Sequence, residues 1–206
     1  MIQLFPFHDL QNRVIFIKVK SANDAHGTKR MYRNDTELLA TAQIRSCLCA
    51  LGVEANSIMS LSAYALHANR MDGLTVSAAQ GKENAVAIYN VVRYNQATDT
   101  TGPLGLRANV FNTAGTRAKS LFLVVADTDK ITFHVKGHSC LRRIMSWCPV
   151  IPLEVFVTAL QLPGSMDSVI GGINALLATT YAPQKTDRPV KPNKKRKLEA
   201  RSKSRD

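Results

Sequence analysis

The alternation of apolar and polar side chains is clearest over residues 14–20, where three aliphatic residues fall on one face. Phe16, Lys18 and Lys20 fall on the other face. A period of two predicts a β-strand with one face in the core and the other in water. Residues 21–33 are polar and basic, which predicts a loop after this strand.

A helix is predicted to begin at Asn34, because the Asn34 side chain can cap it and Glu37 can reach back to complete a capping box. Apolar residues then recur at helical spacing, and Gly52 supplies a stop. A second helix is predicted over residues 57–68. Two more helices are predicted near the end of the chain, from Pro152 to residue 162 and over residues 166–177.

The middle of the chain has a β-type pattern with turn residues between short apolar runs. We interpret the spacing as an antiparallel sheet, with the last pair of strands joined by a turn at residues 127–130. The predicted fold class is therefore α+β, with helices packed on a central antiparallel sheet. The predicted strands are residues 85–94, 106–111, 120–126 and 131–135.

Charge divides the chain into two parts. The whole chain has a formal net charge of +12, and residues 183–206 hold ten Lys or Arg against three acidic residues. This tail has three prolines and almost no large apolar residue, so it cannot bury enough surface to offset its ordering entropy. We expect a globular domain over residues 1–182 and a disordered basic tail over residues 183–206.

The tail carries a run of four consecutive cations that resembles a monopartite nuclear import signal. Such a run also suits nucleic-acid phosphates, so we predict both an importin adaptor and nucleic acid as partners. The alternative is a tail that only confers solubility. The residues assigned to import and nucleic-acid binding are Lys191, Lys194, Lys195, Arg196, Lys197, Arg201, Lys203 and Arg205.

A candidate basic face on the globular part combines two groups of cations, one near Tyr32 and one near Trp147. Aromatic rings among cations can stack on bases or lie at a membrane interface. The alternative is that these residues lie on solvated faces of unrelated elements. The residues of the candidate face are Lys18, Lys20, Lys29, Arg30, Arg33, Arg142 and Arg143.

Catalytic motifs are absent from the sequence. It contains no G-x-S-x-G elbow, no G-x-x-x-x-G-K-[ST] phosphate loop, no dinucleotide fingerprint and no H-E-x-x-H helix. A zinc site is disfavoured, because Cys47 and Cys49 on one helix point about 200° apart; His138, Cys140 and Cys148 are the other ligands considered. We therefore expect no catalytic residue, no metal and no cofactor, and a start in the cytosol because no signal sequence opens the chain.

The order of parts resembles the matrix proteins of rhabdoviruses, especially the plant members that replicate in nuclei. The resemblance rests on the strand, the basic loop with Tyr32 and the capped helix within residues 13–70, together with size, charge and the basic tail. It implies a non-enzymatic viral structural protein that binds ribonucleoprotein and anionic membrane and self-associates as a homo-oligomer. It also implies a location in the host nucleus, the cytoplasm and the virion.

Two other classes of protein remain open at this point. One is a nucleic-acid-binding viral coat or accessory protein, in which the tail packages the genome. The other is a small nuclease or nucleic-acid-modifying enzyme. Ordered particles formed without lipid would favour the first of these, and metal-dependent turnover would favour the second.

Overall fold

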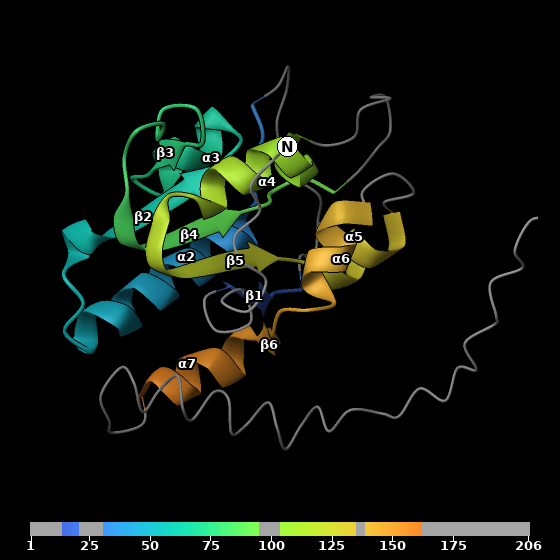
Figure 1. The fold of residues 1–206 in the computed structure, drawn as a ribbon. Coiled ribbons are helices and arrows are strands. Elements are labelled where there is room, and N and C mark those ends of the chain that lie inside the picture. The colour runs from blue at the N-terminus through green and yellow to red at the C-terminus, as the bar shows by residue number, and fades with distance from the viewer. Residues whose placement is uncertain (1–13, 21–30, 95–103, 135–138, 162–206) are drawn as a thin grey trace, which may run out of the picture.

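A single parallel β-sheet forms the centre of the molecule (Figure 1). The computed structural model describes residues 14–20, 31–94, 104–134 and 139–161. Six strands lie in the order β3-β2-β4-β5-β1-β6, and every neighbouring pair is parallel. The strands are β1 (Val14–Lys18), β2 (Ile58–Ser62), β3 (Leu74–Thr75), β4 (Asn84–Asn90), β5 (Ala118–Ala126) and β6 (Val150–Pro152).

Helices cover both faces of the sheet (Figure 1). One apolar core lies between the sheet and α2 and α7, and a second core lies between the sheet and α4, α5 and α6. The helices are α2 (Asp35–Ala50), α3 (Ala65–Arg70), α4 (Ala108–Gly115), α5 (Thr128–His134), α6 (Ser139–Met145) and α7 (Leu153–Gln161), with 3₁₀ turns at Ala55–Ser57 and Leu104–Leu106.

The prediction of an antiparallel sheet in an α+β fold is wrong, because the sheet is parallel and the fold is α/β. The first strand illustrates the error. Ile15 and Ile17 are buried as predicted and pack toward α2 and α7, but Phe16 is also fully buried and packs toward α4. Strands of a parallel sheet are covered by helices on both faces. The face that carries Phe16, which we predicted to lie in water, is therefore buried at Phe16.

Three of the predicted elements have a different secondary structure. Residues 57–68, predicted as one helix, contain the fully buried strand β2 followed by α3. Residues 106–111, predicted as a strand, lead into helix α4, and residues 128–134, predicted as part of a turn and a strand, form helix α5. Helices α3 and α4 lie on crossover connections between neighbouring parallel strands, and α5 and α6 lie on the connection from β5 to β6.

The ends of two helices agree with the sequence pattern. Asn34 caps α2, since its Oδ1 atom accepts a hydrogen bond from the Glu37 backbone N–H at 3.2 Å. The second half of the predicted capping box is wrong, because the Asn34 backbone N–H donates to His67 Nδ1 and the Glu37 side chain accepts from Asn34 Nδ2 instead. Gly52, with φ of 89°, follows the helix as predicted. Helix α7 starts directly after Pro152, in agreement with the predicted helix there. The helix predicted over residues 166–177 lies outside the described residues.

The carboxyl ends of β1, β4 and β5 lie side by side. We call this side of the sheet, where the strands end, its carboxyl edge. The chain leaves β1 toward α2 on one face and leaves β5 toward α5 on the other. Neighbouring strands whose connections go to opposite faces open the place where α/β sheets commonly bind ligands. Across the described ranges, no helix combines the length and apolar character needed to cross a membrane.

Candidate functional site

A buried carboxyl group, that of Glu37, lies at the carboxyl edge of the sheet. Glu37 lies in the first turn of α2, and three groups donate hydrogen bonds to it. The Val92 backbone N–H is 2.9 Å from Oε2, while the Tyr94 hydroxyl at 2.6 Å and Asn34 Nδ2 at 3.2 Å both contact Oε1. Glu37 therefore joins the start of α2 to the segment that follows β4.

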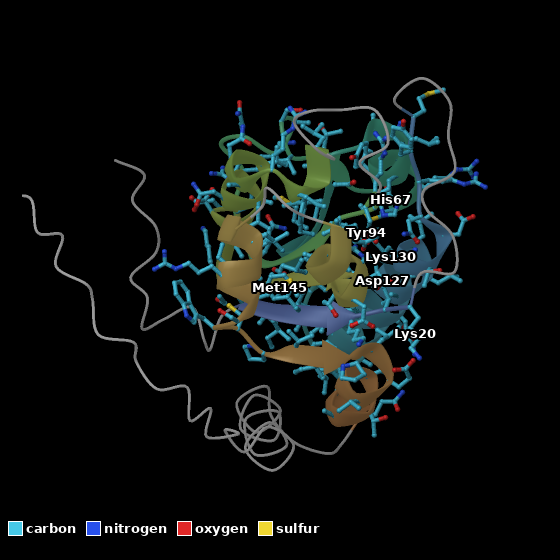
Figure 2. The ribbon with its side chains drawn as sticks, turned by 90° about the vertical axis from the view of Figure 1, so that its right-hand side faces the viewer. Lys20, His67, Tyr94, Asp127, Lys130 and Met145 are labelled. Carbon is cyan, nitrogen blue, oxygen red and sulfur yellow. The ribbon has the colours of Figure 1, made fainter. Side chains whose placement is uncertain are left out.

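Tyr94 extends this network to the neighbouring strand. Its hydroxyl oxygen accepts a hydrogen bond from the backbone N–H of Asp127, 2.6 Å away, at the end of β5. The Asp127 side chain in turn caps α5 by accepting from the Lys130 backbone N–H at 3.2 Å. Figure 2, which looks toward this edge, shows Tyr94, Asp127 and Lys130 together with His67 above them.

His67 of α3 is the second buried titratable group at this edge. Its Nδ1 atom accepts from the Asn34 backbone N–H at 3.2 Å. Burial lowers the pKa of His67 from 6.5 to about 4, although a hydrogen bond with the Asn90 side chain opposes this shift. The imidazole is therefore neutral near pH 7, with its proton on Nε2.

The Asn90 amide completes the contacts of His67. As placed, Asn90 Oδ1 accepts from the Thr41 hydroxyl at 2.9 Å, while Asn90 Nδ2 and His67 Nε2 lack acceptors. Exchanging the oxygen and nitrogen of the amide gives His67 Nε2–H an acceptor and leaves the Thr41 oxygen to accept from Nδ2. This orientation is the one consistent with the hydrogen bond between His67 and Asn90.

Burial raises the pKa of Glu37 from 4.5 to about 8, and the nearby Asp127 charge adds to the increase. The hydrogen bonds from Tyr94 and from the backbone of Val92 lower the pKa but do not cancel the cost of burial. Glu37 is fully enclosed and its oxygens are already bonded within the protein. It thus fixes the backbone at this edge rather than meeting a ligand.

The surface around this buried network carries several cations of the candidate basic face. Lys18 forms an ion pair with Asp129 at 2.8 Å, and Arg33 pairs with Asp35 at 3.2 Å. Lys20 is exposed just beyond β1 (Figure 2). Ion pairing reduces the charge that Lys18 and Arg33 offer to an external anion.

The second group of that face lies elsewhere. The Arg143 guanidinium stacks over the Trp147 ring at 4.7 Å from its centroid, between α6 and β6. Trp147 precedes the amino end of β6, whereas Lys20 follows the carboxyl end of the adjacent strand β1, so the structure separates the two groups. Lys29, Arg30 and the Arg142 side chain lie outside the described residues, as do the tail residues from Lys191 to Arg205.

The loop before β4 lies at the amino ends of the strands, and one arginine, Arg117, donates hydrogen bonds to it. Arg117 Nη1 donates to the carbonyl oxygens of Lys82 at 3.2 Å and Ala79 at 3.5 Å. Residues 80–83 are exposed, and Gly81 has a φ of 78° that favours glycine. We call residues 79–83 the braced loop. Its Lys82 side chain is exposed to solvent, and its backbone is held by the hydrogen bonds from Arg117.

The three cysteine side chains that the structure describes do not form a recognisable site. Cys47, Cys49 and Cys148 are free thiols, and burial raises the pKa of Cys148 to about 11, which keeps it protonated. Within the part of the chain that the structure describes, no group of three His, Cys, Asp or Glu residues is placed to hold a metal ion. His138 and the Cys140 side chain fall outside that part.

A parallel, doubly covered sheet with polar side chains at the carboxyl ends of its strands is typical of nucleotide-dependent α/β domains. The sequence profile of the AAA domain family matches residues 3–129, which is more than half of the chain. The chain therefore belongs to the AAA domain family. No curated protein matches it.

This family assignment corrects several predictions from the sequence. The family is one of P-loop NTPase-like and helicase domains, so the resemblance to rhabdovirus matrix proteins is wrong. The prediction of a non-enzymatic viral structural protein, and of a coat-like alternative, is overturned by the same match. Layout, size and charge misled because unrelated folds can share them.

One prediction about partners agrees with the family. Helicase-like domains of this kind commonly bind nucleic acid, which is consistent with the predicted nucleic-acid partner. The importin adaptor, the anionic membrane, the homo-oligomer and the nuclear location stay predictions. The division into residues 1–182 and 183–206 also stays a prediction.

The sequence pattern did not reveal the residues that organise the two ends of the strands. Tyr94 and Arg117 stand in stretches with no catalytic motif, and Glu37 was assigned only a capping role. The three donors that converge on Glu37 come from residues 34, 92 and 94, so no local pattern reveals them.

Proposed function

We propose that this chain is a nucleic-acid-binding domain of a nucleotide-dependent, helicase-like enzyme. The single observation that carries the proposal is the family match over residues 3–129, which covers β1 to β5 of an all-parallel sheet. Helicase-like enzymes couple nucleotide hydrolysis to movement on nucleic acid, so both ligands are expected here. The strongly basic chain, with a net charge of +12, supports a polyanionic partner.

We propose that the phosphate-binding loop of the nucleotide site is not supplied by residues 1–206 of this chain. The sequence contains no G-x-x-x-x-G-K-[ST] motif, whose backbone N–H groups and lysine hold the phosphates of a nucleotide. Without that motif, the domain adds side chains to a nucleotide held elsewhere. Hydrolysis by the chain alone is then expected to stay at background.

The braced loop is a surface we assign to nucleotide phosphates, at the amino ends of the strands and apart from the carboxyl ends where α/β sheets commonly bind ligands. Lys82 is an exposed cation next to a glycine turn, and Arg117 holds the two carbonyls that flank this turn. Lysine side chains are common phosphate ligands, whereas the backbone N–H groups of Gln80 and Lys82 already donate to the carbonyl oxygens of Ser77 and Ala79. A rigid backbone keeps such ligands in place before the nucleotide arrives.

The test combines three measurements on the full chain. Single-stranded RNA and DNA binding is followed by fluorescence anisotropy, nucleotide contact by photo-crosslinking with 8-azido-ATP, and hydrolysis by phosphate release. We expect binding of single strands, crosslinking that Lys82→Ala reduces at least several-fold, and no hydrolysis above background. Lys20→Ala is the matched control, because Lys20 is also an exposed cation and lies at the carboxyl ends of the strands.

The outcomes separate the parts of the proposal. A chain that binds neither nucleic acid nor the nucleotide probe contradicts the proposed function as a whole. Hydrolysis by the chain alone contradicts only the claim that the phosphate loop lies outside it. Equal crosslinking of the Lys82→Ala and Lys20→Ala variants removes the braced loop from the nucleotide site.

A further inference from the structure

The segment after β4 contains a backbone conformation that L-residues rarely adopt. The Arg93 N–H donates to the Val91 carbonyl oxygen at 2.9 Å, and Val92 between them has a φ of 71°. A hydrogen bond from residue i+2 back to residue i around a positive φ defines a γ-turn of the rare, strained kind. For a β-branched residue such as Val92 this conformation is a true outlier.

The surrounding structure holds this γ-turn from three sides. Glu37 Oε2 accepts from the Val92 N–H at 2.9 Å, and Asn34 Nδ2 donates to the Val92 carbonyl oxygen at 3.3 Å. On the third side the backbone of Gly105 packs so closely that a Cβ atom there would overlap the Val91 carbonyl oxygen. Strain that is held this firmly is found mainly at functional sites.

The γ-turn determines where the Arg93 side chain lies. Val91, Val92 and Tyr94 are all fully buried, whereas Arg93 between them is half-exposed. Its guanidinium lies 4.5 Å from the centroid of the Tyr32 ring. The γ-turn thus places one cation at the surface of an otherwise buried segment.

Tyr32 is itself held in position. Its ring packs edge-on against buried Tyr64, with centroids 5.4 Å apart and an interplanar angle of 78°. Tyr32 is partly buried, and Met31 beside it is 56% exposed. We call Arg93 and Tyr32 together the Arg93–Tyr32 stack, a planar cation on an aromatic ring, both partly accessible to solvent, at the carboxyl edge.

We propose that the Arg93–Tyr32 stack is a contact site for single-stranded nucleic acid, in which an unpaired base continues the stack and Arg93 meets an adjacent phosphate. This inference rests on the proposed function, since it names where the nucleic acid of that function is held. Bases stack on tyrosine rings and on guanidinium planes in a way that tolerates any sequence. A duplex hides its base faces, so the stack favours a single strand.

The cost of the strained turn is consistent with this role. The free guanidinium of a flexible arginine loses side-chain entropy when it binds, and a guanidinium already stacked on Tyr32 loses less. The fixed backbone at Val92 and the ring of Tyr32 therefore prepare Arg93 for a ligand. Phosphate is a suitable ligand because the guanidinium can offer it two parallel N–H donors.

The experiment measures binding of the full chain to a fluorescein-labelled single-stranded 12-mer over a range of salt concentrations. We expect Tyr32→Ala to weaken binding about 5- to 150-fold with an unchanged salt slope, because stacking on one base is lost. Arg93→Gln should weaken binding and reduce the slope by about 0.7, the value for one phosphate of a single strand. Tyr32→Phe keeps the ring and should bind like the natural chain.

Two controls keep the result specific. Arg70→Gln removes an exposed cation at the end of α3 and should leave the affinity unchanged. Binding to a duplex of the same sequence should not respond to Tyr32→Ala. Photo-crosslinking of a 4-thiouridine strand to the natural chain gives a readout that needs no variant, and Tyr32 or a residue directly beside it should carry the crosslink.

The failures of the two proposals can be told apart. If the natural chain does not bind single strands, the proposed function fails and this inference fails with it. If the natural chain binds but Tyr32→Ala and Arg93→Gln bind equally well, only the inference is overturned. An equal loss of duplex binding in Tyr32→Ala, or a crosslink far from Tyr32, also overturns it.

Discussion

At the residue scale, folding changes the pKa values of two buried groups, Glu37 and His67, in opposite directions. The pKa of Glu37 is raised from 4.5 to about 8 and that of His67 is lowered from 6.5 to about 4, in both cases chiefly by burial. Between pH 4.5 and 6.5 the folded chain holds a proton on Glu37, while the unfolded chain holds one on His67. The two states then bind equal numbers of protons at these residues, and the pair adds no pH dependence to stability.

Above that range the balance changes. From pH 6.5 to about 8 the unfolded chain has lost the proton of His67, but the folded chain still keeps the proton of Glu37. The folded state binds more protons, so stability must fall as the pH rises, by about 1 kcal/mol per pH unit. We predict a plateau in the urea midpoint below pH 6.5 and a decline above it.

The variant Glu37→Gln isolates this contribution, because it keeps the shape of the side chain and removes the titration. The difference in unfolding free energy between the natural chain and Glu37→Gln should fall by about 1 kcal/mol per pH unit from pH 4.5 to about 8, because the variant loses only the titration of Glu37 and keeps the opposing titration of His67. Glu54→Gln, at an exposed position, is the control for the substitution of a carboxyl by an amide. A constant difference across the whole range would falsify the raised pKa of Glu37.

At the scale of single elements, the γ-turn at Val92 predicts a reversal of the usual order of alanine and glycine. At ordinary positions glycine is less stable than alanine by about 0.5–1 kcal/mol. With a φ of 71° at Val92, alanine keeps the strain and glycine removes it. We therefore predict that Val92→Gly is more stable than Val92→Ala by about 1 kcal/mol, measured by urea unfolding.

The matched pair for this comparison is Val124→Ala and Val124→Gly in β5. Val124 is as fully buried as Val92 but lies in a regular strand. There the alanine variant should be the more stable of the two. The same order at both positions would mean that the turn at Val92 stores no strain.

The sequence predicts where several elements lie but not how the strands run. The apolar runs of β1, β4 and β5 were recognised, because a buried strand needs a continuous run of β-forming side chains. Strand direction depends on the connection, and α4 and α5 were taken for strands. Short runs such as residues 106–111 are ambiguous between a strand and the start of a helix, and this ambiguity changed the predicted fold class.

The candidate sites were harder to predict, for the same physical reason. The cap at Asn34 is local and was found, since donor and acceptor are three residues apart. The bond from Val92 to Glu37 spans 55 residues, and the stack of Arg93 on Tyr32 also joins distant parts of the chain. Only the parallel order of the strands brings these side chains to one edge.

At the scale of the whole molecule, two kinds of nucleic-acid contact are proposed in one chain. Residues 183–206 hold ten of the 27 lysines and arginines, so their attraction to phosphates should depend strongly on salt. The Arg93–Tyr32 stack should depend much less on salt, because stacking of a base releases no counterions. The two contributions can therefore be separated by salt concentration.

Removing residues 183–206 provides the test at this scale. The truncated chain should bind a single-stranded 12-mer with a salt slope smaller by about 0.7 for each phosphate that the tail contacts. The factor by which Tyr32→Ala weakens binding should be the same in the full and truncated chains, since contributions of distant sites add.

A full chain with a scrambled tail sequence is the control. It should keep the natural salt slope, because the composition of the tail sets the slope, but it should lose nuclear accumulation if residues 194–197 act as an import signal. Unchanged salt dependence in the truncated chain would remove the tail from nucleic-acid binding and leave the folded domain as the site of contact.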